Sequence, residues 1–62
     1  MSADTRQALI DSAISLFSTK WYATVSVAEI CRKARLSNGA FYRQFHSKEE
    51  IFCTILDYVV DQ

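Results

Sequence analysis

The sequence predicts an all-α fold: a three-helix bundle with a helix-turn-helix, followed by the start of a fourth helix. The 62 residues include no proline and one glycine, so few positions interrupt a helix. Apolar residues recur at three- and four-residue steps, and no stretch alternates apolar and polar residues for long. Residues suited to helix caps precede the periodic segments. A chain of this length forms one domain with a marginal core.

The first helix is expected over residues 5–20, with Asp4 as its N-cap and Gln7 three residues further on. Trp21 and Tyr22 are expected to close its apolar face where the chain turns. The residues of that face recur at helical spacing: Leu9, Ile10, Ala13, Leu16 and Phe17.

The second helix is expected over residues 27–34, because Ser26 and Glu29 form a capping box at its start. A helix this short does not persist alone and must be held by packing. Its buried stripe consists of Val27, Ile30, Cys31 and Ala34. Arg35 follows, at a position where a turn commonly needs a left-handed residue. A residue with a Cβ pays on the order of 1 kcal/mol for that conformation.

The third helix is expected over residues 38–45, after Ser37 as its cap, with Phe41 and Phe45 on its buried face. A second capping box, in residues 47–50, starts a fourth helix expected over residues 48–62. The stripe of that helix is Ile51, Phe52, Ile55, Leu56 and Val59. Its apolar pattern has not ended at Val60, so we expect it to lead into an effector-binding and dimerising domain that this chain does not contain.

The charges are unevenly distributed, although the formal net charge is zero. Residues 26–48 carry five Lys or Arg and one Glu, a balance of +4, whereas residues 49–62 carry four acidic residues and no cation. A basic middle and an acidic end fit a DNA-facing segment followed by one that faces away. Ordinary scatter of charge on a solvated surface explains the same pattern equally well.

The second and third helices, joined by a three-residue turn, form a helix-turn-helix, whose second helix enters the major groove of DNA. Asn38, Gly39 and Ala40 are small or polar at the start of that helix, where its backbone comes closest to DNA. Asn38 and Arg43 are the candidates for base readout, since Asn pairs with adenine and Arg with guanine. Tyr42 and Lys48 are better suited to contacts with DNA phosphates.

These residues resemble the DNA-binding domain of the TetR family. The resemblance covers essentially the whole chain, and its most specific part is the run of residues 36–52, LSNGAFYRQFHSKEEIF. It implies that residues 37–43, including Ser37, read bases, that Tyr42 and Lys48 grip phosphates, and that Ser26 anchors the second helix on the DNA backbone. The partners it implies are a palindromic operator in double-stranded DNA, a homodimer in the full-length protein, and a small-molecule effector bound through the missing domain. The function it implies is ligand-responsive repression.

Three positions depart from the family pattern. The family usually has glycine at Trp21 and Arg35, and threonine at Val25. The first two departures affect the conformational strain of the backbone rather than the surface that faces DNA. The predicted function therefore stands.

Other function classes receive little support. Cys31 and Cys53 lie inside apolar helical patterns and are expected to be two buried thiols. With His46 they lack a fourth ligand and the spacing of a zinc site, so no metal is expected. No serine–histidine–acid constellation or phosphate-binding loop is present in the sequence, so no cofactor or enzymatic activity is expected. No signal peptide or membrane span is recognisable, which makes the cytoplasm the expected location. Two alternatives remain: a helical interaction module that uses the apolar face of the last helix, and a thiol enzyme or redox switch.

Overall fold

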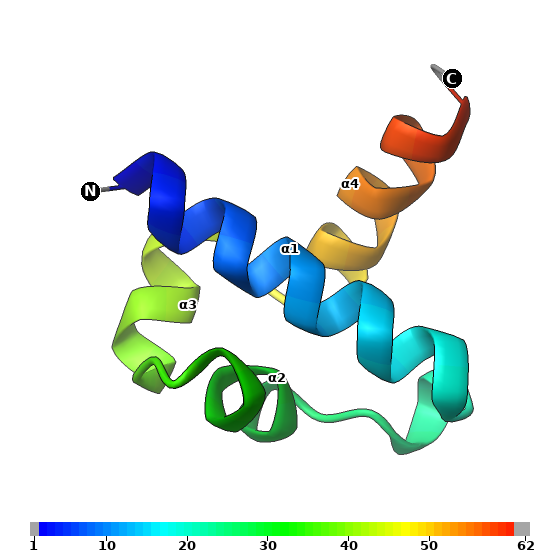
Figure 1. Ribbon diagram of the computed structural model, residues 1–62, viewed down its shortest axis with the longest axis horizontal. Coiled ribbons are helices and arrows are strands. Elements are labelled where there is room, and N and C mark those ends of the chain that lie inside the picture. Colours follow the sequence, from blue (N-terminus) through cyan, green and yellow to red (C-terminus); the bar gives the residue numbers. More distant parts are fainter. Residues whose placement is uncertain (1, 61–62) are drawn as a thin grey trace.

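The computed structural model describes residues 2–60, with side chains from residue 4 onward, and its fold is all-α as predicted. The helices are α1 (Ser2–Thr19), α2 (Val27–Ala34), α3 (Asn38–Gln44) and α4 (Lys48–Val60). A single 3-10 turn that the sequence did not predict, η1 (Tyr22–Thr24), lies between α1 and α2. In Figure 1, α1 crosses the middle of the molecule, α2 and α3 lie on one side of it, and α4 departs on the other.

Helix α1 begins earlier than predicted. Because it starts at Ser2, Asp4 is not its N-cap but lies within its first turn, where the helix dipole favours a carboxylate. The Gln7 side chain does not complete a capping box; its Nε2 donates a hydrogen bond to Asp11 Oδ1, at 2.9 Å. The helix ends at Thr19 rather than residue 20.

Helix α2 has the predicted bounds and the predicted capping box. Ser26 Oγ accepts a hydrogen bond from the Glu29 N–H at 3.1 Å, and Glu29 Oε1 accepts one from the Ser26 N–H at 3.2 Å. Arg35 is left-handed, as expected, with φ 60° and ψ 43°. The Arg35 N–H donates to Arg32 O at 3.1 Å, and the Leu36 N–H donates to Cys31 O at 2.9 Å. This pair of bonds is the Schellman ending of a helix, which is why a left-handed residue is needed there.

Helix α3 begins as predicted, because Ser37 Oγ accepts a hydrogen bond from the Ala40 N–H at 3.1 Å. It ends at Gln44 instead of residue 45, since the backbone of Phe45 is extended.

The capping box predicted for the start of α4 is only half correct. Ser47 Oγ accepts from the Glu50 N–H at 3.2 Å, but the Glu50 carboxylate accepts from the His46 N–H, at 2.7 Å, rather than from Ser47. Helix α4 continues to Val60, and the last two residues of its predicted range lie outside the described residues.

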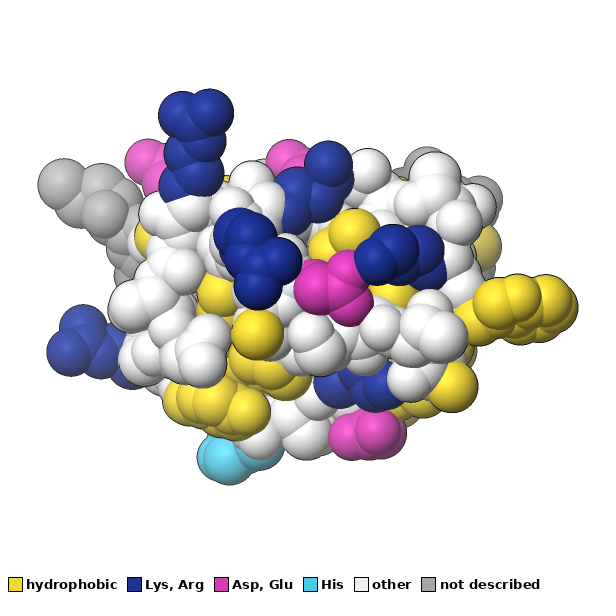
Figure 2. All heavy atoms as spheres, turned by 90° about the horizontal axis from the view of Figure 1, so that it is seen from below, with side chains coloured by type: hydrophobic (Ala, Val, Ile, Leu, Met, Phe, Trp, Pro, Cys, Tyr) yellow, Lys and Arg dark blue, Asp and Glu magenta, His cyan; other side chains and the backbone are white. Residues whose placement is uncertain are grey.

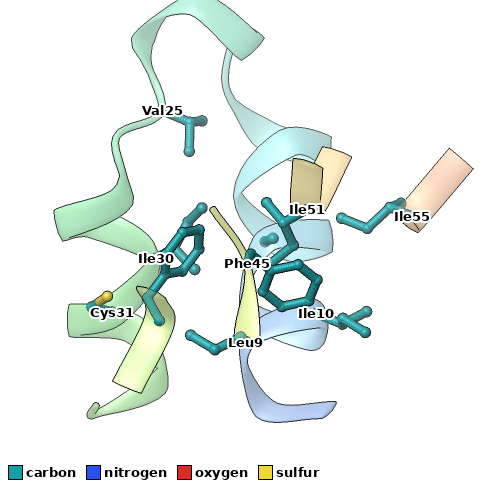
Figure 3. Close-up of a cluster of buried hydrophobic side chains, with 10 residues drawn as sticks. Leu9, Ile10, Val25, Ile30, Cys31, Phe45, Ile51 and Ile55 are labelled. Carbon is teal, nitrogen blue, oxygen red and sulfur yellow. The ribbon is translucent and has the colours of Figure 1, made fainter. Parts of the chain in front are cut away.

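The core lies between α1 and the other helices, as Figure 3 shows. Among residues 4–60, ten apolar residues are buried: Leu9, Ile10, Ala13, Val25, Ile30, Cys31, Phe41, Phe45, Ile51 and Ile55. Phe41 of α3 and Phe45, which directly follows that helix, are both among them, so the predicted burial of the two phenylalanines is confirmed. Burying side chains of this size contributes about 1.5–3 kcal/mol each before the entropy of folding is subtracted.

An aromatic cluster joins η1 to α1 and α4. The ring centroids of Phe17, Tyr22 and Phe52 lie 4.7–5.4 Å apart. Tyr22 alone therefore closes the face of α1, and the expectation that Trp21 does so as well is wrong, since Trp21 is 83% exposed. Trp21 has φ −65° and ψ 140°, a conformation open to any residue, so this turn does not need a glycine.

Two expectations of burial in α4 are also wrong. Cys53 is exposed, so Cys31 is the one buried thiol. Leu56 and Val59, assigned to the buried stripe, are exposed as well. Figure 1 shows the reason: the C-terminal half of α4 extends away from α2 and α3, so among residues 2–60 only α1 lies near it.

Candidate nucleic-acid interface

The residues of α3 and its C-cap are divided between the core and the solvent. Phe41 and Phe45 are fully buried, whereas Asn38, Gly39 and Arg43 are exposed and Ala40 is partly buried. Tyr42 is 54% exposed, with its ring packed edge-on against Phe41 at a centroid distance of 5.2 Å. Most of the α3 residues that are predicted to contact DNA are therefore accessible to solvent, and α3 itself packs against α1 and α2.

No contact among the described residues requires a glycine at position 39. A Cβ at this position would meet only Ser37 Oγ, at 3.7 Å, which is an ordinary van der Waals contact, and φ of Gly39 is not positive. A glycine inside a helix costs roughly 0.5–1 kcal/mol relative to alanine. The fold of the free chain would therefore accept alanine at this position and gain stability from it.

Four exposed cations lie on α2, its terminal turn and α3: Arg32, Lys33, Arg35 and Arg43. Figure 2 shows Lys and Arg side chains distributed over the face that α2 and α3 form. Neither ion pair in the described part of the chain involves these four residues; the pairs are Lys20–Glu29 and His46–Glu50. The hydrogen bond from Lys20 is the main cause of the lowered pKa of the Glu29 carboxyl, the one acidic group within residues 26–48. This face is therefore more basic than the zero net charge of the chain indicates.

The two capping serines stand at the edges of this surface, and both are exposed. The hydroxyls of Ser26 and Ser37 each accept a backbone N–H. A hydroxyl that accepts one hydrogen bond can still donate another, so each cap can also donate to an anion.

Lys48 is held by a contact that sequence reasoning missed. Its Nζ donates to the backbone oxygen of Tyr22 at 3.0 Å and lies 4.3 Å from the centroid of the Tyr22 ring. The Tyr22 hydroxyl also donates to Glu49 Oε2 at 3.0 Å. An ammonium has three protons, so Lys48 can serve this contact and a phosphate together. No local pattern reveals the pair, because the two residues are 26 positions apart.

The surface of α2 and α3 lies in a segment whose sequence matches a known protein family. The family described as bacterial regulatory proteins, tetR family, matches residues 9–54, which include all of α2 and α3. The chain belongs to the tetR family. Membership makes the chain a helix-turn-helix domain, and relatives named as HTH-type transcriptional regulators do not favour the interaction-module interpretation.

Individual relatives in the tetR family agree with this assignment. The uncharacterised HTH-type transcriptional regulator YuxN of Bacillus subtilis is 41% identical over 54 residues, which are 87% of this chain and 19% of that protein. The A-factor receptor protein of Streptomyces griseus is 36% identical over 56 residues, 90% of this chain and 20% of that protein. The regulator AcrR of Shigella flexneri is 36% identical over 52 residues, which are 84% of this chain and 24% of that protein. The chain thus spans about a fifth to a quarter of the length of these relatives. No solved structure matches it significantly.

Arg6 is a second residue of this tetR-family domain that sequence reasoning missed. Its Nη1 donates to Gln44 O at 3.4 Å, and its Cζ lies 4.6 Å from the centroid of the Phe45 ring. The guanidinium therefore sits at the C-terminal end of α3, where the helix dipole favours a cation. It supports the helix that carries the candidate base-reading residues.

The remaining chemistry of the described residues is sparse. Residues 2–60 contain no cluster of three His, Cys, Asp or Glu side chains able to hold a metal ion. None of the helices within the same residues combines the length and hydropathy that a membrane span requires. Burial raises the pKa of the Cys31 thiol, which disfavours the reactive thiolate.

Proposed function

We propose that this domain reads a palindromic operator by placing α3 in the major groove of double-stranded DNA. The observation that carries the proposal is the exposed face of α3, on which a glycine that the fold does not require lies between polar side chains. Close approach to a base edge gives that glycine a purpose, because a Cβ there would project toward the DNA. The major groove is about 12 Å wide and admits one helix.

The proposed base contacts come from two residues on this face. Asn38 lies at the first position of α3, where a recognition helix enters the groove, and its amide pairs with adenine. Arg43 lies five residues later, is exposed, and its fork of donors matches guanine. Gly39 and Ala40 let the backbone between them approach the base edges.

The proposed phosphate contacts frame these base contacts. Ser26 and Ser37 donate from their hydroxyls, Tyr42 from its phenol, and Lys48 from the ammonium protons that Tyr22 does not use. Such contacts position the domain on DNA without selecting a sequence.

In its full-length form we propose a homodimer that acts as a ligand-responsive repressor. A dimer places two recognition helices in successive major grooves, which is what a palindromic site requires. These relatives are about five times as long as the matched segment, which leaves room for an effector-binding and dimerising domain in a protein of this family. One relative is named a receptor protein, which supports a ligand response.

The test is a titration of labelled random-sequence duplex with the 62-residue chain, at several salt concentrations. We expect weak binding, because one half-site offers few contacts, and a steep loss of affinity with salt as phosphate contacts are screened. The matched control is Tyr58→Ala, which removes an exposed aromatic ring from α4 and should bind as the parent does. Binding that is independent of salt, or that disappears with Tyr58, would contradict the proposal.

A further inference from the structure

Arg35 has the one unfavourable backbone conformation in the described part of the chain. Its φ of 60° is the only positive φ among residues 2–60. The Schellman ending of α2 requires that conformation, and glycine adopts it without a steric penalty. The sequence nevertheless places arginine there, so the free fold is less stable than it would be with glycine.

Nothing within the described residues compensates for this choice. Arg35 is exposed, and none of the hydrogen bonds or ion pairs found among residues 4–60 involves its guanidinium. Arg32 and Lys33 precede it, so three cations lie within four residues. The end of the α2 dipole favours cations there, but three like charges this close also repel one another. Both the strained backbone and the repulsion would be offset by an anion bound at this turn.

The position of the turn identifies that anion. Arg35 lies two residues before Ser37, the cap of α3, so it stands beside the end of α3 that carries Asn38 and Gly39. A helix that enters the major groove with this end has the phosphates of the groove edge beside the preceding turn.

We propose that Arg35 binds a DNA phosphate next to the helix-turn-helix turn, and that this contact accounts for an arginine in a left-handed position. The proposal rests on the DNA-binding function argued above. Arg35 therefore adds to affinity for every duplex without reading a base.

The experiment compares the parent with Arg35→Gly and Arg35→Lys, using thermal unfolding and anisotropy of a labelled random duplex at about 50–200 mM salt. Arg35→Gly should melt higher, on the order of 4 °C, because the strain is removed. It should also bind roughly threefold to tenfold more weakly, with a salt slope smaller by about one unit. Arg35→Lys keeps the charge and should bind as the parent does.

The control is Arg35→Gly combined with Asp57→Asn. The second substitution removes a negative charge at an exposed position of α4 and so restores the net charge of the chain. Phosphate contact predicts that affinity stays low in this double variant, while recovery would reduce the effect to overall charge and overturn the proposal. An Arg35→Gly variant that binds like the parent, or that melts lower, also overturns it. Failure of the parent itself to bind duplex would instead reject the proposed function.

Discussion

The α2–α3 unit and the α1–α4 pair depart from an ideal fold in different ways. The α2–α3 unit buries its apolar residues but contains two local backbone costs, Gly39 inside a helix and Arg35 in a left-handed turn. The α1–α4 pair has no such cost among its described residues. It instead exposes apolar side chains around a shallow groove of about 260 Å³, lined by Ile10, Ile14, Ile55, Tyr58 and Val59 together with Gln7.

This difference indicates that the α2–α3 face and the α1–α4 face suit different binding partners. Local rules are broken at functional sites when a contact absent from the free chain offsets the cost. In the α2–α3 unit the broken rules coincide with exposed cations and polar side chains, which suits a polyanion. The groove between α1 and α4 is mostly apolar, and α4 carries Glu49, Glu50 and Asp57, which does not suit one.

The largest expected effect is loss of folding on Phe41→Ala. Phe41 is fully buried between α3 and the rest of the core, and truncating such a ring costs about 3–5 kcal/mol. That equals the whole stability a core of this size supplies, so the variant should lack a cooperative transition in circular dichroism. Leu56→Ala, in the exposed half of α4, should change stability by less than about 1 kcal/mol. Equal losses would remove the contrast between the two regions.

The next effect separates base reading from backbone contact within the α2–α3 surface. Arg43→Ala should cost about 1–3 kcal/mol of binding free energy, mainly at one base pair. Lys48→Ala should weaken binding to all duplexes alike, and it should also lower stability by about 1 kcal/mol because the bond to Tyr22 O is lost. Affinities of the two variants for duplexes that differ at single base pairs measure the base-specific loss and the general loss. Equal, sequence-blind losses would reassign Arg43 to the DNA backbone.

Gly39→Ala should move stability and binding in opposite directions. The added Cβ meets no close contact in the free chain, so the free energy of unfolding should rise by about 0.5–1 kcal/mol. Affinity for duplex DNA should fall, because the Cβ lies where we place the base edges. Denaturant unfolding measures the change in stability, and a DNA titration of the same sample measures the change in affinity. Unchanged affinity would mean that α3 does not approach DNA at Gly39.

The smallest effect is a loss of stability in acid. The backbone hydrogen bond from His46 is the main cause of the lowered pKa of Glu50, and the pKa values of Glu29 and Glu49 are lowered as well. A carboxyl whose pKa is lower in the folded state stabilises the fold above its unfolded pKa, and that stability is lost as the pH falls through the folded value. The melting temperature should therefore fall from about pH 5 to about pH 3. Glu50→Gln should reduce that dependence, and thermal unfolding of both proteins across this pH range measures it.

Sequence reasoning predicted the features that depend on neighbours in the chain. The caps at Ser26 and Ser37 and the left-handed Arg35 were correct because each depends on backbone groups only a few residues away. The buried stripe of α3 was correct because a short helix held by packing must bury its two phenylalanines.

The predictions that were wrong or missing concern features that the local sequence pattern does not determine. The exposure of Cys53 and Leu56 follows from where α4 points relative to α1, and apolar spacing alone does not define that direction. The exposure of Trp21 depends on the path of the chain between α1 and η1. The contact between Lys48 and Tyr22 is a long-range one of the same kind. Asp4 was misplaced because a polar residue near a helix start suits the cap and the first turn alike.

The most direct test of the contrast between the two regions is an amide chemical-shift titration of the labelled chain with duplex DNA. We expect the largest changes at the start of α2, in the turn at Arg35, along α3 and at Lys48, with the second half of α4 unchanged. Changes centred on the groove residues Ile14, Tyr58 and Val59, with α3 unperturbed, would contradict the assignment of the α2–α3 face to DNA.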